Sequence, residues 1–115
     1  MTNVTRAEVD LAVAACQGAL EDRDTLALAV RKSLEWFAQA NPGRAVEVRV
    51  PPFKAVQILG GTTHRRGTPP AVVEMSPQTW LELFTRKLTW DQAVATGQIV
   101  ASGERSDLVK YLEFL

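Results

Sequence analysis

The 115-residue chain has one cysteine, one histidine and no excess of charge, and each of these shortages excludes a class of protein. A single cysteine, Cys16, excludes an internal disulfide and favours a reducing compartment. It lies on an apolar helical stripe with no second cysteine or histidine near it, so we expect a buried, inert thiol. One histidine, His64, is too few for a His-rich metal site. The 13 basic and 13 acidic residues cancel, which argues against a general nucleic-acid-binding protein.

Long hydrophobic runs are also missing. No segment approaches the roughly 18 apolar residues that a transmembrane helix needs. Residues 2–10 are polar and lack the apolar centre of a signal peptide, and Phe114-Leu115 is not a peroxisomal address. We therefore expect a cytoplasmic protein without an integral membrane segment. Apolar residues make up 46% of the chain, enough for residues 1–115 to fold as a single domain without disulfides or metals.

Motifs of catalysis are equally scarce. Gly60-Gly61 is not followed by the Gly-Lys of a phosphate-binding loop, and Ser102-Gly103 lacks the pattern of a nucleophile elbow. His64-Arg65-Arg66 is most simply a solvated basic loop. An enzyme would have to combine His64 with Glu74 or Asp91, and nothing in their spacing favours such a site. We expect a protein that is not an enzyme.

The front of the chain predicts two amphipathic helices. Thr5-Arg6-Ala7-Glu8 is a capping box, and apolar residues follow it at helical spacing as far as Leu20. Asp22 or Asp24 caps a second helix, which ends at the three breakers of Asn41-Pro42-Gly43.

Strands are predicted in the middle of the chain. Valines alternate with charged residues over residues 44–50, the pattern of a half-buried strand. Pro51-Pro52 interrupts it, because proline cannot donate to the sheet, and a second strand follows over Phe53–Leu59. Gly60-Gly61 is a turn. Thr62–Pro69 is either an edge strand with a loop or a loop throughout.

The last third, residues 70–115, predicts two strands and three helices. Ala71–Met75 is a short buried strand, and Ser76-Pro77 begins a helix. Thr89 opens a capping box for a short second helix, and Gly97 supplies the left-handed residue that ends it. A strand over Gln98–Ser102, a turn and a terminal helix capped by Ser106 complete the chain.

This order of elements predicts an α+β fold. Runs of strands beside runs of helices favour a mixed or mostly antiparallel sheet covered on one face by helices, with two helices at the N-terminus. Glu74 follows two valines, so we expect it to be partly buried and paired with an arginine.

The motifs of the last third resemble the sterol carrier protein type 2 family, and Arg-Gly-Thr-Pro-Pro at residues 66–70 resembles its small bacterial orthologues. The matching residues are Val72–Glu74, Ser76, Trp80–Phe84, Ala93, Gly97, Ile99–Val100, Ser102-Gly103 and Leu108–Leu115. Two features depart from the family. Arg86-Lys87 stands where the family often has glycine between the two central helices, and the region before Arg66 is short for its usual strands.

The resemblance implies a non-catalytic lipid carrier. A stripe of tryptophan and leucine is by itself more typical of a core than of a ligand wall. In the family, however, the C-terminal helices and the sheet enclose a hydrophobic tunnel, which implies ligand contacts for Trp80, Leu83, Phe84, Trp90, Val94, Leu108 and Leu112. The implied ligand is an apolar molecule: a fatty acyl chain, an acyl-CoA, an isoprenoid or a sterol-like compound.

The implied carrier is a monomer or homodimer with transient membrane contact and no cofactor. One alternative remains open, a structural or protein-interaction module of the same fold with a filled cavity. Its contact surface would lie on the two N-terminal helices, Arg6–Ala40. An apolar outer surface beside Trp36 and Phe37 would favour this alternative.

Overall fold

The computed structural model describes residues 3–17, 22–43, 45–58 and 71–102. Its elements follow in the order α1 (Arg6–Gln17), α2 (Arg23–Ala40), β1 (Val46–Val50), β2 (Lys54–Ile58), β3 (Ala71–Met75), α3 (Pro77–Phe84), α4 (Trp90–Ala95) and β4 (Ile99–Ser102). The fold is α+β, as the sequence predicts. The predicted turn at Gly60-Gly61, the segment Thr62–Pro69 and the terminal helix lie outside the described residues.

Both N-terminal helices begin at capping residues. The hydroxyl of Thr5 accepts a hydrogen bond from the backbone N–H of Glu8 at 3.2 Å. Of the two candidate caps for α2, the structure selects Asp22, whose carboxylate accepts from the N–H of Asp24 at 3.1 Å. A further bond from the hydroxyl of Thr25, together with that N–H, lowers the pKa of Asp22. The bonds to Thr5 and Asp22 each satisfy a backbone N–H at the start of a helix, which has no partner within the helix itself.

The sheet is mixed, with strand order β2-β1-β3-β4. β1 pairs with β2 and β3 pairs with β4 in antiparallel register, whereas the central pair, β1 and β3, is parallel. The predicted interruption at Pro51-Pro52 is the connection between β1 and β2, and its peptide bond is cis.

The alternating valines place one face of the sheet in the core. Val46, Val48 and Val50 are fully buried, and Val73 of β3 continues the same face. The opposite face is polar, because Arg49 points outward and its guanidinium bonds the carboxylate of Glu47 at 3.1 Å. A half-buried antiparallel or mixed sheet shows this period-2 pattern.

The expectation that Glu74 is partly buried is wrong, whereas its pairing with an arginine stays a prediction, because Arg65 and Arg66 lie outside the described residues. Glu74 is exposed on the outer face, because it alternates with buried Val73 and Met75 along β3. It lies opposite Arg49 in the parallel register. Arg49 nevertheless makes its ion pair with Glu47.

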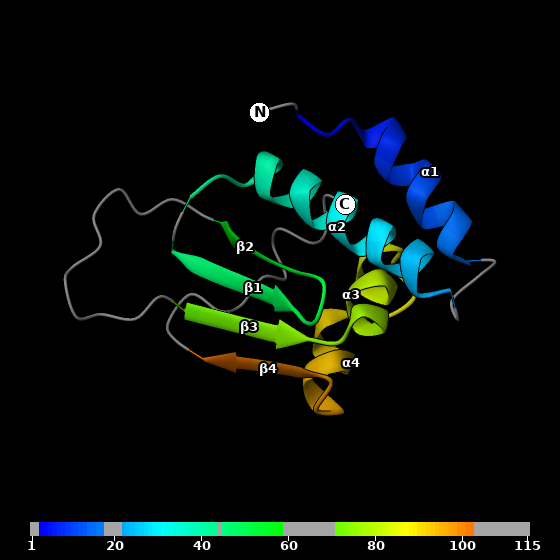
Figure 1. Cartoon of the computed structure of the whole chain (residues 1–115). Coiled ribbons are helices and arrows are strands. Elements are labelled where there is room, and N and C mark those ends of the chain that lie inside the picture. Colours follow the sequence, from blue (N-terminus) through cyan, green and yellow to red (C-terminus); the bar gives the residue numbers. More distant parts are fainter. Residues whose placement is uncertain (1–2, 18–21, 44, 59–70, 103–115) are drawn as a thin grey trace.

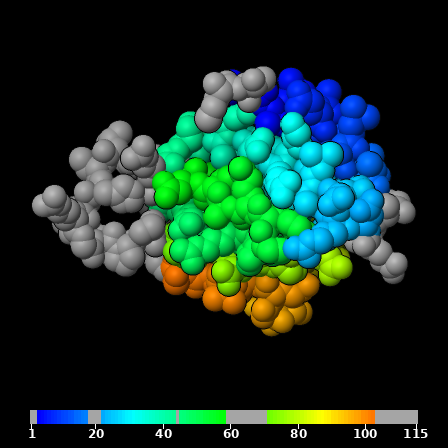
Figure 2. All heavy atoms as spheres, viewed as in Figure 1, coloured from blue at the N-terminus to red at the C-terminus, as the bar shows by residue number. Residues whose placement is uncertain are grey.

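The N-terminal helices form two layers on the buried face of the sheet (Figure 1). α2 packs on the sheet and on α3, while α1 packs on α2. α3 and α4 lie at one end of the strands. Figure 2 shows the atoms of α2 between those of α1 and those of β1 and β2. The core is therefore built around α2, and α1 is added to its outer side.

The predicted starts of α3 and α4 are confirmed. The hydroxyl of Ser76 accepts from the N–H of Thr79 at 3.1 Å, and Pro77 occupies the first turn of α3. Thr89 and Gln92 form the complete capping box of α4. Gly97, with a φ of +73°, is the left-handed residue that follows α4.

The turn between α3 and α4 contains a residue in an unfavourable backbone conformation. Arg86 has a φ of +63°, a left-handed conformation that costs a non-glycine residue roughly 1–2 kcal/mol. The turn is fixed by bonds from the N–H groups of Lys87 and Leu88 to the carbonyl of Glu82, at 2.8 and 3.2 Å. The departure from the family pattern at Arg86 is thus a departure at the position where glycine fits the backbone best.

We expect Arg86→Gly to be more stable than Arg86→Ala by about 1 kcal/mol. Both variants remove the arginine side chain, so their difference isolates the left-handed backbone. Urea unfolding of the two proteins measures the difference. Equal midpoints would show that the turn relaxes out of the left-handed region at no cost.

Candidate functional site

Four aromatic side chains from α2 and α3 form a cluster between these helices: Trp36, Phe37, Trp80 and Phe84. The ring centroid of Trp80 lies 5.4 Å from that of Phe37 and 6.0 Å from that of Phe84. Trp36 meets Phe84 edge to face at 6.3 Å. The indole N–H of Trp80 donates to the hydroxyl of Ser33 at 2.8 Å, so its one polar atom is satisfied inside the core.

Most of the predicted ligand-wall residues are buried. Trp80, Leu83, Phe84 and Trp90 are all in the core, and they come from the inward sides of α3 and α4. Val94 differs, with 48% of its surface exposed. Leu108 and Leu112 lie outside the described residues. The contact of these seven residues with a ligand stays a prediction.

α1 is held on this cluster by an arginine. The guanidinium of Arg6 lies 4.6 Å from the ring centroid of Trp36 and 4.9 Å from that of Phe84. Its Nε donates to the carboxylate of Asp10 at 2.9 Å, one helical turn further along. A guanidinium over two aromatic faces is attracted by both rings. Arg6 therefore joins α1 to α2 and α3 together.

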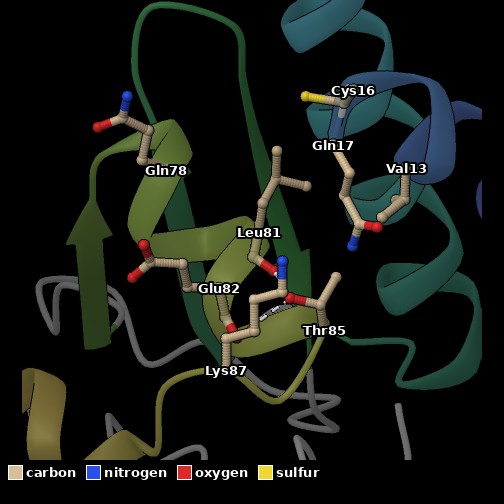
Figure 3. A pocket seen from close by; sticks show the side chains of 8 residues that line it. All are labelled: Val13, Cys16, Gln17, Gln78, Leu81, Glu82, Thr85 and Lys87. Atoms are coloured by element: carbon tan, nitrogen blue, oxygen red, sulfur yellow. Dashed lines mark hydrogen bonds between the residues drawn. The ribbon is translucent and has the colours of Figure 1, made fainter. Parts of the chain in front are cut away.

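A cavity of about 280 Å³ lies between α1 and α3 (Figure 3). Its apolar residues are Val13 and Cys16 from α1 and Leu81 from α3, all of them buried. Its polar residues are Gln17, Gln78, Glu82, Thr85 and Lys87. In Figure 3 the side chain of Lys87 rises between Leu81 and Thr85, and the carboxylate of Glu82 points away from Val13 and Gln17.

α3 has two faces with different surroundings, and only one of them was singled out from the sequence. Trp80, Leu83 and Phe84 face the core, whereas the residues at positions 78, 81, 82 and 85 face the cavity. These positions follow the three- and four-residue spacing that places side chains on one side of a helix. The signal for the second face was Leu81, an apolar residue among polar neighbours at that spacing.

Burial alters the chemistry of the cysteine in the cavity. Loss of hydration raises the pKa of the Cys16 thiol, since the charged thiolate is poorly solvated there. The thiol is therefore protonated at neutral pH and a poor nucleophile. The sequence-based prediction of a buried cysteine is confirmed.

The helix-covered face of the sheet is open at β4. Ala101 pairs with Val73, and directly paired residues of antiparallel strands project to the same face. Val73 is fully buried, but Ala101 is exposed. Ile99, two residues before Ala101 on the same face, is buried next to Met75. In the part of the chain that the structure describes, the cover over this face thus ends between Ile99 and Ala101.

The outer side of the two N-terminal helices has a shallow apolar groove. Leu11, Ala12, Ala15 and Leu28 line it, with Glu8 and Lys32 forming a 3.3 Å ion pair at its edge. The apolar outer surface beside Trp36 and Phe37 that would favour an interaction module is absent from the described residues, because Phe37 is buried and Trp36 is half-buried beneath Arg6.

The structure places only some of the residues considered for catalysis. Across residues 3–17, 22–43, 45–58 and 71–102, no group of three His, Cys, Asp or Glu side chains is placed to hold a metal. Glu74 and Asp91 are exposed, and His64 lies outside these ranges. In the same ranges, no helix is long and apolar enough to cross a membrane.

Comparison with known proteins identifies one family. The family model described as bacterial SCP ortholog, for sterol carrier protein, matches residues 22–114. The match begins at the cap of α2 and so leaves out α1. No curated protein matches the chain.

Proposed function

The chain belongs to the bacterial orthologues of sterol carrier proteins, and we propose on this basis that it is a non-catalytic carrier of an apolar, lipid-like molecule. The ligand is a fatty acyl chain, an acyl-CoA, an isoprenoid or a sterol-like compound. It lies between the C-terminal helices and the sheet.

The observation that carries this proposal is the open end of the helix-covered face at Ala101. Val73 on β3 and its partner Ala101 on β4 lie on the same face of the sheet, but Val73 is buried and Ala101 is exposed. A hydrophobic ligand would cover the exposed apolar surface at Ala101 favourably. Each Å² of apolar area removed from water contributes roughly 25 cal/mol. Val94 on α4 adds a half-exposed apolar side chain near the end of the described chain.

The residues proposed for the ligand wall divide into two groups. Trp80, Leu83, Phe84 and Trp90 form the rigid backing of the wall, because they are packed in the core. Val94 is exposed and makes direct contact with the ligand, and Leu108 and Leu112 complete the proposed wall.

Native mass spectrometry of the purified protein, followed by organic extraction, tests this function. We expect a lipid bound at near one molecule per chain, and we expect Val94→Glu and Leu112→Glu to lose it, because a carboxylate would be desolvated by the apolar ligand. Val100→Glu is the matched control, since Val100 is 66% exposed on the outer face of the sheet. A protein that carries no lipid and takes up no fatty acid, acyl-CoA, isoprenoid or sterol would refute the carrier function.

A second function is favoured by the groove between α1 and α2. Leu11 is 74% exposed and Leu28 is also exposed, which is unusual for two large apolar side chains in one groove. In this alternative the protein is an interaction module that forms a homodimer through these helices. Sedimentation would then show a dimer that Leu11→Glu dissociates, and a monomer at all concentrations would dismiss it.

A further inference from the structure

We propose that the cavity between α1 and α3 is a separate binding site for a medium-chain carboxylate, with its tail over Val13, Cys16 and Leu81 and its head at Lys87. The site lies on the face of α3 opposite to the proposed carrier wall. One wall is α1, which the family match does not include.

The size of the cavity selects a small ligand. Its 280 Å³ falls just below the roughly 300–1,000 Å³ of sites for drug-sized molecules. It corresponds to about nine units of ~30 Å³, the share of one water in the liquid and close to that of one methylene group. A single chain of about ten carbons fits this volume, whereas a sterol or a diacyl lipid would extend beyond it.

The polar rim selects an anionic head. In the part of the chain that the structure describes, the ammonium of Lys87 forms no ion pair. The side-chain amide of Gln17 makes no hydrogen bond within that same part. The hydroxyl of Thr85 already donates to the carbonyl of Leu81 at 2.7 Å. Lys87, in the turn after α3, and Gln17, at the end of α1, are therefore left as donors for a carboxylate, together with Gln78 at the start of α3.

The acidic residue at the rim does not oppose this arrangement. The carboxylate of Glu82 points away from Gln17 and Val13, on the other side of Lys87 (Figure 3). An anion between Lys87 and Gln17 would therefore contact the ammonium of Lys87 rather than the carboxylate of Glu82. An exposed pair of this kind contributes up to about 1 kcal/mol, so the tail supplies most of the affinity and the head supplies selectivity.

Decanoate and 1-decanol, which have the same tail and different heads, test the site. With the co-purified lipid still in the carrier site, we expect titration calorimetry to show one further decanoate per chain, and we expect Lys87→Gln to weaken it about fivefold while leaving decanol unchanged. Arg31→Gln is the matched control, because it removes the same charge from an exposed position on α2. Decanoate affinity should be unaffected there.

Cys16 locates the bound molecule, because it is the only thiol in the chain and lines the cavity. Saturating decanoate should slow its alkylation by N-ethylmaleimide at least tenfold (about 1.4 kcal/mol of protection). Decanoate that binds without protecting Cys16, or that binds Lys87→Gln and Arg31→Gln equally, lies elsewhere and overturns this site while leaving the carrier function intact. No binding of decanoate at all would also overturn it.

Discussion

Trp80→Ala is expected to lower the free energy of unfolding by about 3–5 kcal/mol, the largest effect expected of any single truncation among the described residues. Trp80 is fully buried and is the largest of the fully buried side chains. Its removal opens a cavity between Phe37 and Phe84 and leaves the hydroxyl of Ser33 without its indole donor. Small domains are stable by about 5–15 kcal/mol, so this variant is expected to be marginal.

Two milder variants separate the hydrogen bond from the packing. Trp80→Phe removes the indole N–H and part of the volume, while Ser33→Ala leaves the N–H buried without an acceptor, which costs about 1–3 kcal/mol. Because Ser33 and Trp80 share one bond, their combined effect should fall short of the sum by about 1 kcal/mol. Urea unfolding of the four proteins measures this coupling. Full additivity would show that the bond contributes nothing.

Val9→Asp is expected to detach α1 and to raise the reactivity of Cys16 about a hundredfold. Val9 is fully buried on the inner side of α1, and an unpaired carboxylate there costs several kcal/mol. The chain avoids this cost by releasing α1, so the loss of stability cannot exceed the free energy that docks the helix. If the docking free energy of α1 is about 3 kcal/mol, its loss exposes the Cys16 thiol roughly a hundred times more often. The alkylation rate of Cys16 measures it.

Leu11→Asp is the control for this variant. It introduces the same charge into the same helix, at a residue that is 74% exposed. It should change the free energy of unfolding by no more than about 0.5 kcal/mol, and the alkylation rate of Cys16 should change correspondingly little. Circular dichroism of Val9→Asp should show loss of one helix with the rest retained. Cooperative loss of all structure would mean that α1 is an integral part of the domain.

Local sequence patterns were sufficient to predict the elements and their caps. Asp22, Ser76 and Thr89 each satisfy a backbone donor a few residues away, so the chemistry that starts each helix lies within one turn of it. The same holds for the valines of β1, whose alternation determines which face is buried.

The arrangement of these elements depends on distant contacts and was predicted less completely. Arg6 contacts Phe84, which is far from it in the sequence, and no local pattern encodes that contact. The parallel pairing of β1 with β3 was likewise open in the prediction of a mixed sheet. The cavity was missed for the same reason. It depends on α1 lying beside the polar face of α3, which neither helix specifies alone.

The position of Arg6 over Trp36 has a spectroscopic consequence. Trp36 is half-buried and Arg6 comes from α1, so its emission should change when α1 moves. Trp80 and Trp90 are buried, and their emission should change mainly when the core unfolds. A protein with phenylalanine at positions 80 and 90 therefore keeps Trp36 as its one indole, whose emission changes when α1 moves and again when the core unfolds. The docking of this helix can be followed in real time through an indole that the chain already contains.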